Sequence, residues 1–218
     1  FRPVASGLIP VRLAWMAGVS LVAGSIAVGG LTTNGKLAAV LAGYVALTLS
    51  YSLWLKHIAI IELMAVAGGF LLRPMAGAAA TDVPVSRWFI IVASFGSLYM
   101  VVGKRYAEVT ELGDGAANHR RILSAYPAEY LRQTRELAAG VTLLAYCLWA
   151  FERAPSSGPP WSQLSIIPIT FGLLRYALLL EKGQGGAPEE VVLRDRQLLV
   201  TGLIWVLLFG LSAAKVGT

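Results

Sequence analysis

Charged side chains gather where one long apolar segment of this chain ends. Residues 88–102 carry no charge. They are followed by Gly103-Lys104-Arg105-Tyr106-Ala107-Glu108. Two bases and an acid bunched at such a point suit the binding of an anionic group, although Lys and Arg also anchor membrane helices at the water interface. We therefore expect Lys104 and Arg105 to belong to a site for an anionic ligand.

Other ionisable residues lie at the end of an apolar segment or inside one. Lys56 follows the aromatic run that begins at Tyr51. Two roles are equally compatible with this position, a contact to a phosphate and an anchor at the membrane interface. Glu62 and Arg73 fall within the third apolar segment, where a charge is costly and is usually paired or functional. For Arg73 the choice is between a ligand phosphate and a structural carboxylate. Bases that converge beside an apolar groove suit an anionic lipid.

Several other chemistries find no support in the residues. The two histidines, His57 and His119, have no partner at a zinc-ligand spacing. The chain has no phosphate-binding loop, nucleophile elbow or His-Glu-x-x-His pattern. The net charge of +6 is concentrated at the ends of apolar segments, so it indicates a membrane protein and not a partner of nucleic acid.

Composition predicts an all-α, polytopic transmembrane helix bundle. The chain is 56% hydrophobic and only 14% charged. A membrane span needs roughly 20 mostly apolar residues. Seven spans are expected, at Val11–Leu31, Lys36–Leu55, Ile58–Ala80, Arg87–Gly103, Leu137–Phe151, Leu164–Leu180 and Leu198–Ala214.

The connections between these spans predict the orientation of the bundle. Residues 1–218 are expected to form one transmembrane domain, with a long charged cap loop at about 104–136 that holds a surface helix at Ala128–Glu136. Most of the 18 Lys and Arg residues fall on the side of this loop. The excess of basic residues marks that side as cytoplasmic, so the site is expected to face the cytoplasm.

Motifs spread over the whole chain resemble the UbiA superfamily of intramembrane prenyltransferases. The closest likeness is to the branch that transfers phosphoribose to decaprenyl phosphate. The motifs are Phe1-Arg2-Pro3, Tyr51 to His57, Phe70 to Arg73, Gly103 to Glu108, Leu148 to Arg153, Leu174 to Ala177 and Leu193 to Arg196.

The resemblance implies a nine-span fold, of which this chain holds seven spans and lacks two that precede them. The Asp-rich metal motif of the superfamily would lie in the preceding part, so no metal ligand is assigned here. We therefore expect the sequence to be part of a longer or divided protein.

The resemblance also implies an activity in the bacterial inner membrane. Phosphoribose would pass from 5-phosphoribosyl pyrophosphate to a polyprenyl phosphate, with release of pyrophosphate, using Mg²⁺ and serving cell-wall arabinan synthesis. The alternative is prenyl transfer from a diphosphate to an aromatic acceptor, which predicts an Asp-rich motif at residues 103–112. Lys104 and Arg105 stand there instead. The sequence leaves homo-oligomerisation open.

Specific roles follow from this resemblance. Lys56, Lys104 and Arg105 are expected to contact phosphate groups. Glu108 is expected to hold the ribose hydroxyls, a second metal or one of the bases. The other expected substrate contacts are Tyr51, Arg73, Tyr106, Arg121 and Tyr126.

Overall fold

The computed structural model describes residues 6–8, 10–112, 121–153, 158–184 and 188–214. Every regular element within these ranges is a helix, which confirms the predicted all-α class. The elements are α1 (Val11–Thr32), α2 (Gly35–Leu53), η1 (Leu55–His57), α3 (Ile61–Thr81), α4 (Arg87–Leu112), η3 (Arg121–Ala125), α6 (Ala128–Glu152), α7 (Trp161–Leu164), α8 (Ile166–Glu181), α9 (Pro188–Arg194) and α10 (Arg196–Ala214).

Six helical stretches in the described part are long and apolar enough to cross a membrane. They are Val11–Leu31, Gly35–Leu53, Ile61–Thr81, Arg87–Glu111, Trp161–Glu181 and Arg196–Ala213. The expectation of seven spans is therefore confirmed for six. The seventh, Leu137–Phe151, lies inside α6, whose first three turns are polar. The nine-span architecture stays a prediction.

The predicted cap loop at 104–136 is wrong in its extent. Two helices occupy most of it, since α4 continues to Leu112 and α6 begins at Ala128. Helix-favouring residues follow Gly103, and Ala107 is fully buried, so nothing in the sequence stops α4 there. The predicted surface helix Ala128–Glu136 is likewise wrong as a separate element. Leu131 and Arg135 bury its first turns within the protein.

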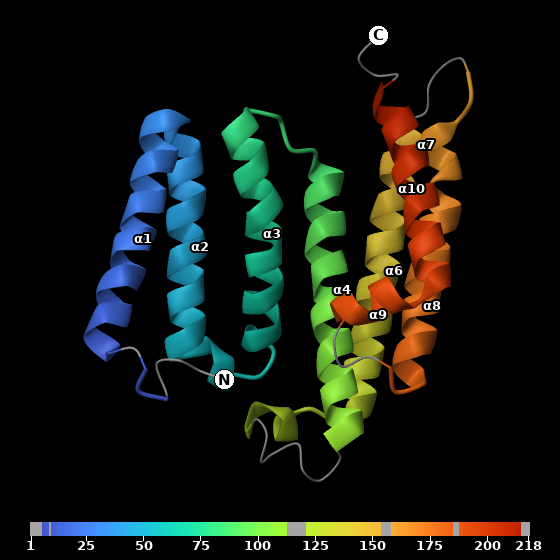
Figure 1. The fold of residues 1–218 in the computed structure, drawn as a ribbon. Helices are drawn as coiled ribbons and strands as arrows, with labels where there is room; N and C mark the ends of the chain where they lie inside the picture. The colour runs from blue at the N-terminus through green and yellow to red at the C-terminus, as the bar shows by residue number, and fades with distance from the viewer. Residues whose placement is uncertain (1–5, 9, 113–120, 154–157, 185–187, 215–218) are drawn as a thin grey trace.

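The long helices stand side by side and alternate in direction (Figure 1). In chain order α1 to α4 form one half of the bundle, and α6, α8 and α10 form the other. The two halves are joined by α4 and α6, which make the most extensive pairing. The short helix α9 lies across the long helices near the end that also holds η1 and η3. This arrangement brings the charged ends of α4, α6 and α8 together.

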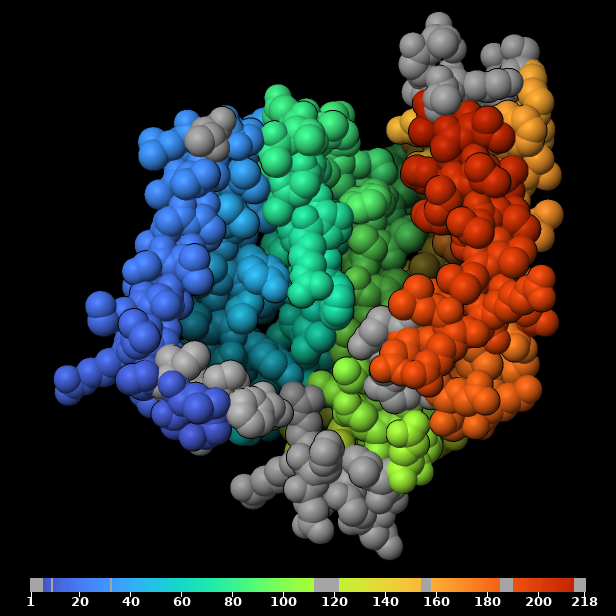
Figure 2. Space-filling model, in the orientation of Figure 1, coloured from blue at the N-terminus to red at the C-terminus, as the bar shows by residue number. Residues whose placement is uncertain are grey.

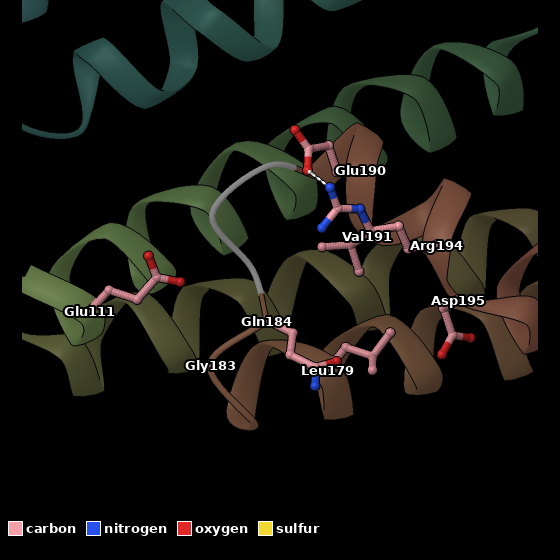
Figure 3. A pocket seen from close by; sticks show the side chains of 8 residues that line it. All are labelled: Glu111, Leu179, Gly183, Gln184, Glu190, Val191, Arg194 and Asp195. Carbon is pink, nitrogen blue, oxygen red and sulfur yellow. Dashed lines mark ion pairs between the residues drawn. The ribbon is translucent and has the colours of Figure 1, made fainter.

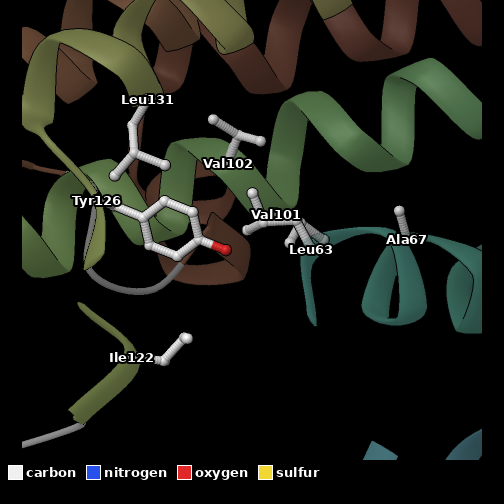
Figure 4. Packing of buried hydrophobic residues seen from close by; sticks show 7 residues of the cluster. All are labelled: Leu63, Ala67, Val101, Val102, Ile122, Tyr126 and Leu131. Carbon is white, nitrogen blue, oxygen red and sulfur yellow. The ribbon is translucent and has the colours of Figure 1, made fainter. Parts of the chain in front are cut away.

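Two apolar clusters hold this end of the bundle. The first joins α3, α4, η3 and α6 through Leu63, Ala67, Val101, Val102, Ile122, Tyr126 and Leu131 (Figure 4). The second joins α4 to α6, α8 and α10. Gly103 permits the close approach of α4 to α8, because a Cβ atom there would lie 2.9 Å from Leu180 Cδ1. The two clusters together determine which face of α4 points toward each neighbouring helix.

Candidate functional site

A groove of about 970 Å³ runs along one side of α4 toward its charged end. Its apolar part includes Val66 and Phe70 of α3 and Met100 of α4. The charged end is lined by Lys104, Arg105 and Glu108, and α9 contributes Val192 and Leu193. A groove that is cationic at one end and apolar along its length matches an amphiphile with an anionic head.

Arg105 is held between two carboxylates. Its Nε donates to Glu62 Oε1 at 2.9 Å, and its Nη2 donates to Glu62 Oε2 at 3.2 Å. Its Nη1 donates to Glu108 Oε2 at 2.7 Å. The Glu62 side chain is 0% exposed and that of Arg105 is 6% exposed. Arg105 therefore closes an ion pair between α3 and α4, and Glu108 accepts from the same guanidinium. The expected role of Glu108 at the substrate stays a prediction.

Lys104 differs from Arg105 although the two are adjacent. Its side chain is half-buried and lines the groove. No ion pair joins Lys104 to an acid within the part of the chain that the structure describes. Because Arg105 is neutralised by two acids, Lys104 is, among the described residues that line the groove, the cation that has charge to offer a ligand. The predicted phosphate contact therefore falls most directly on Lys104.

Tyr51 and Arg73 lie on the α2–α3 side of the groove. Tyr51 lines both the groove and a smaller adjoining cavity of about 140 Å³, which Arg73 also lines. The Arg73 guanidinium donates to the Tyr44 hydroxyl at 3.4 Å and lies 4.8 Å from the Phe70 ring centre. Among the described residues it has no carboxylate partner. Arg73 therefore lies beside Phe70, which lines the apolar part of the groove, and Lys104 lies at the charged end.

Two further predicted residues belong to the short helices at the charged end of the bundle. Lys56 belongs to the short helix η1 and is half-buried. Arg121 begins η3, but its side chain lies outside the described atoms. The structure thus brings η1 and η3 to the charged end, and Lys56 does not line the groove. Their expected roles stay predictions.

Tyr106 faces a second charged cluster on the other side of α4. Its hydroxyl donates to Glu181 Oε2 at 2.8 Å, and Arg135 Nη2 donates to Glu181 Oε1 at 2.6 Å. The Arg135 guanidinium also lies 4.8 Å from the Tyr106 ring centre. Tyr106 therefore ties α4 to α6 and α8, and the structure does not bring it to the groove.

Tyr126 supports the site through the backbone. Its side chain is buried, and its hydroxyl accepts the Ile60 N–H at 2.7 Å. Ile60 has a φ of 68°, which is rare for a β-branched residue and costs about 1–3 kcal/mol. Two residues further on, Glu62 reaches Arg105. Burial is the main reason that the pKa of Tyr126 is raised, so its hydroxyl keeps its proton at neutral pH.

The sequence did not predict which base pairs with each of the acids at this end of the bundle. Glu62, Glu181 and Asp195 pair with Arg105, Arg135 and Arg175 respectively. The available signal was an acid near the end of one apolar segment and a base near the end of another. That signal indicates pairing, but it does not say which acid meets which base.

A polar pocket of about 390 Å³ lies between the end of α4, the end of α8 and the short helix α9 (Figure 3). Its ionic side chains are Glu111, Glu190, Arg194 and Asp195. Arg194 is paired with Glu190, and Asp195 is paired with Arg175. In the described ranges, no three His, Cys, Asp or Glu side chains are grouped as a metal would require.

These features define a helical membrane protein with one groove that is cationic at its end and apolar along its length. The chain belongs to the UbiA prenyltransferase family, whose model matches residues 1–199.

Three relatives carry the description decaprenyl-phosphate phosphoribosyltransferase. The chain is 43% identical to that of Corynebacterium glutamicum over 94% of its own length and 63% of the relative's length. It is 42% identical to that of Mycobacterium tuberculosis over 98% of this chain and 70% of the relative. For Mycolicibacterium smegmatis the identity is 40%, over 94% of this chain and 67% of the relative. The chain thus spans about two thirds of the length of these relatives.

Proposed function

We propose that this chain takes part in phosphoribosyl transfer from 5-phosphoribosyl pyrophosphate to decaprenyl phosphate or a similar polyprenyl phosphate. The observation that carries the proposal is the groove, in which Lys104 stands at the end of an apolar wall formed by α3 and α4. The relatives described as decaprenyl-phosphate phosphoribosyltransferases support the same substrate pair. In this proposal the lipid phosphate binds at Lys104 and the isoprenoid chain follows the groove.

The proposed reaction exchanges one bond at the ribose anomeric carbon. An oxygen of the lipid phosphate bonds to that carbon while the bond from the carbon to pyrophosphate breaks, and pyrophosphate leaves with the electron pair. A phosphate oxygen is already ionised at neutral pH, so no strong general base is needed. Lys104 orients the phosphate through charge-assisted hydrogen bonds, and the buried Glu62–Arg105 pair fixes the helix turn that carries Lys104.

Magnesium enters the proposal through family membership. The metal would counter the charge of pyrophosphate, as cations do in phosphoryl and glycosyl chemistry. The described side chains supply no ligand cluster, so no step is assigned to the metal here.

The proposed location is the inner membrane of a bacterium, with the charged end in the cytoplasm. The basic residues near η1, η3 and α9 support this orientation under the positive-inside rule. The proposed product would feed cell-wall arabinan synthesis. Homo-oligomerisation stays a prediction.

The test uses the protein at its full natural length in detergent with Mg²⁺. Phosphoribosyl pyrophosphate labelled in the ribose is supplied with decaprenyl phosphate, and the label is followed into the lipid fraction. Label in the lipid that disappears when decaprenyl phosphate is left out supports the proposal. Absence of label, together with prenylation of an aromatic acceptor from a prenyl diphosphate, refutes it and favours ordinary prenyl transfer.

A further inference from the structure

A second apolar cavity lies at the opposite end of α3 and α4 from Lys104. Its volume is about 410 Å³, and α3, α4, α6 and α10 all line it. Aromatic rings make up much of its wall, namely Trp88, Phe89, Tyr146, Trp149, Trp205 and Phe209. The expected site residues all lie elsewhere. We call this cavity the distal aromatic pocket.

The rings of the distal aromatic pocket are held in place by one another. Trp149 and Phe209 stack at 5.5 Å between ring centres, and Trp205 and Phe209 stack at 5.2 Å. Trp205 Nε1 donates to the Tyr146 hydroxyl at 2.8 Å, and that hydroxyl also shares a 2.6 Å hydrogen bond with Ser165 Oγ. The polar atoms of Trp205 and Tyr146 are therefore satisfied inside the protein. Arg153, Ser86 and Ser212 also line the pocket, and the rest of its wall is preformed apolar surface.

The pocket and the groove adjoin each other along α3 and α4. Val92 lines both. On α3 the groove residues Val66 and Phe70 are followed, in steps of four, by the pocket residues Pro74 and Ala78, and steps of four keep residues on one helix face. Figure 2 shows the hollow between α3 and α10, with α4 behind it. From Lys104 to Trp88 the path along α4 is about 24 Å at 1.5 Å per residue.

We propose that the distal aromatic pocket binds the far isoprene units of the lipid whose phosphate binds at Lys104, and so selects long-chain acceptors. The inference rests on the proposed function. Its occupant follows from the adjoining groove, since a chain fixed at Lys104 is led along α3 and α4 to Val92 and into the pocket. Isoprene units are apolar, branched and unsaturated, and they pack well on aromatic faces.

The experiment compares two acceptors with the same phosphate head, farnesyl phosphate and decaprenyl phosphate. The full-length wild-type protein is compared with Phe209→Ala, and the matched control is Phe171→Ala. Phe171 is an exposed aromatic residue of α8 that lines neither cavity. We expect Phe209→Ala to raise KM for decaprenyl phosphate about tenfold, because an aromatic contact with the far isoprene units is lost, with little change for farnesyl phosphate. The control should match the wild type with both acceptors.

The result that overturns the inference is an equal change, or none, for the two acceptors in Phe209→Ala. Wild-type transfer to both lipids with that result would leave the proposed function intact and remove the pocket's role. If the variant fails to fold, Phe209→Leu keeps the test open.

A thermal-shift measurement reports binding without turnover, so it still decides the inference if no transfer occurs. Decaprenyl phosphate should stabilise the wild type more than farnesyl phosphate does, and Phe209→Ala should remove the difference. Equal stabilisation of the wild type by the two lipid phosphates would overturn the inference. So would a Phe209-dependent stabilisation by ordinary phosphatidylglycerol, which would assign the pocket to bilayer lipid.

Discussion

Replacing Glu62 by Leu should destabilise this bundle severely, because it leaves the Arg105 guanidinium buried with only Glu108 as its partner. Glu62 is 0% exposed and accepts two charge-assisted hydrogen bonds from Arg105, at 2.9 and 3.2 Å. Removing one partner of such a buried pair costs about 3–5 kcal/mol, since the remaining charge cannot be solvated. Glu108, with a side chain 21% exposed, offsets only part of that cost.

The assay is the free energy of unfolding in detergent, measured by titration with a denaturing detergent. Glu129→Leu is the matched control, because Glu129 pairs with Arg132 on the exposed start of α6 at the same end of the bundle. The control should show no measurable loss. The double variant Glu62→Leu with Arg105→Met should recover most of the stability, because well-packed apolar residues commonly replace a buried ion pair without loss.

Two outcomes would refute the reasoning. One is a loss in Glu62→Leu no larger than that in the Glu129 control. The other is a double variant as unstable as Glu62→Leu alone. If the double variant is stable, its transfer activity further separates two roles of Arg105. Retained activity means that Arg105 only holds α4 to α3, and lost activity means that Arg105 also acts on the substrate.

Two further predictions concern single charges. Lys104→Met should lower kcat/KM with decaprenyl phosphate about 10- to 100-fold, because a charge-assisted hydrogen bond to the phosphate is lost. Lys36→Met, at the opposite end of the bundle, should leave kcat/KM unchanged. Steady-state kinetics measure both variants, and equal effects of the two substitutions would contradict the role of Lys104. The hydrogen bond from Arg175 holds the pKa of Asp195 below its usual value, so this carboxylate stabilises the fold at neutral pH and loses that effect as pH falls below about 4. Melting temperatures from about pH 7 to pH 3 should therefore converge for the wild type and Asp195→Asn, and parallel curves would contradict the pairing.

Local properties of the sequence were enough to predict the helices that cross the membrane. Apolar runs of the required length, with charges only at their ends, gave six of the expected spans. The same reasoning failed for α6, whose first turns bury Leu131 and Arg135 in the protein on one face and expose Glu129 and Arg132 on the other. The stretch between Ala128 and Leu137 contains no Gly or Pro, so an unbroken helix was predictable from the residues.

The charged end of α4 was predictable from the sequence, but its ion pairs were not. The run from Gly103 to Glu108 lies at that end and Lys104 lines the groove, while the expected roles at a substrate stay predictions. Arg105 and Tyr106 instead turn to Glu62 and Glu181, which lie 43 and 75 positions away in the chain. One helix turn carries neighbouring residues to different faces, so adjacent charges meet different partners.

The sequence by itself determined the helical membrane class, the positions of most spans and the end at which charge gathers, because these depend on the hydropathy and length of each segment. Only the tertiary structure decided that Arg105 is neutralised while Lys104 faces the groove, and that the groove leads to a distal aromatic pocket. Those features depend on how each helix is rotated against its neighbours, and the rotation is set by close packing of side chains such as Leu180 on Gly103.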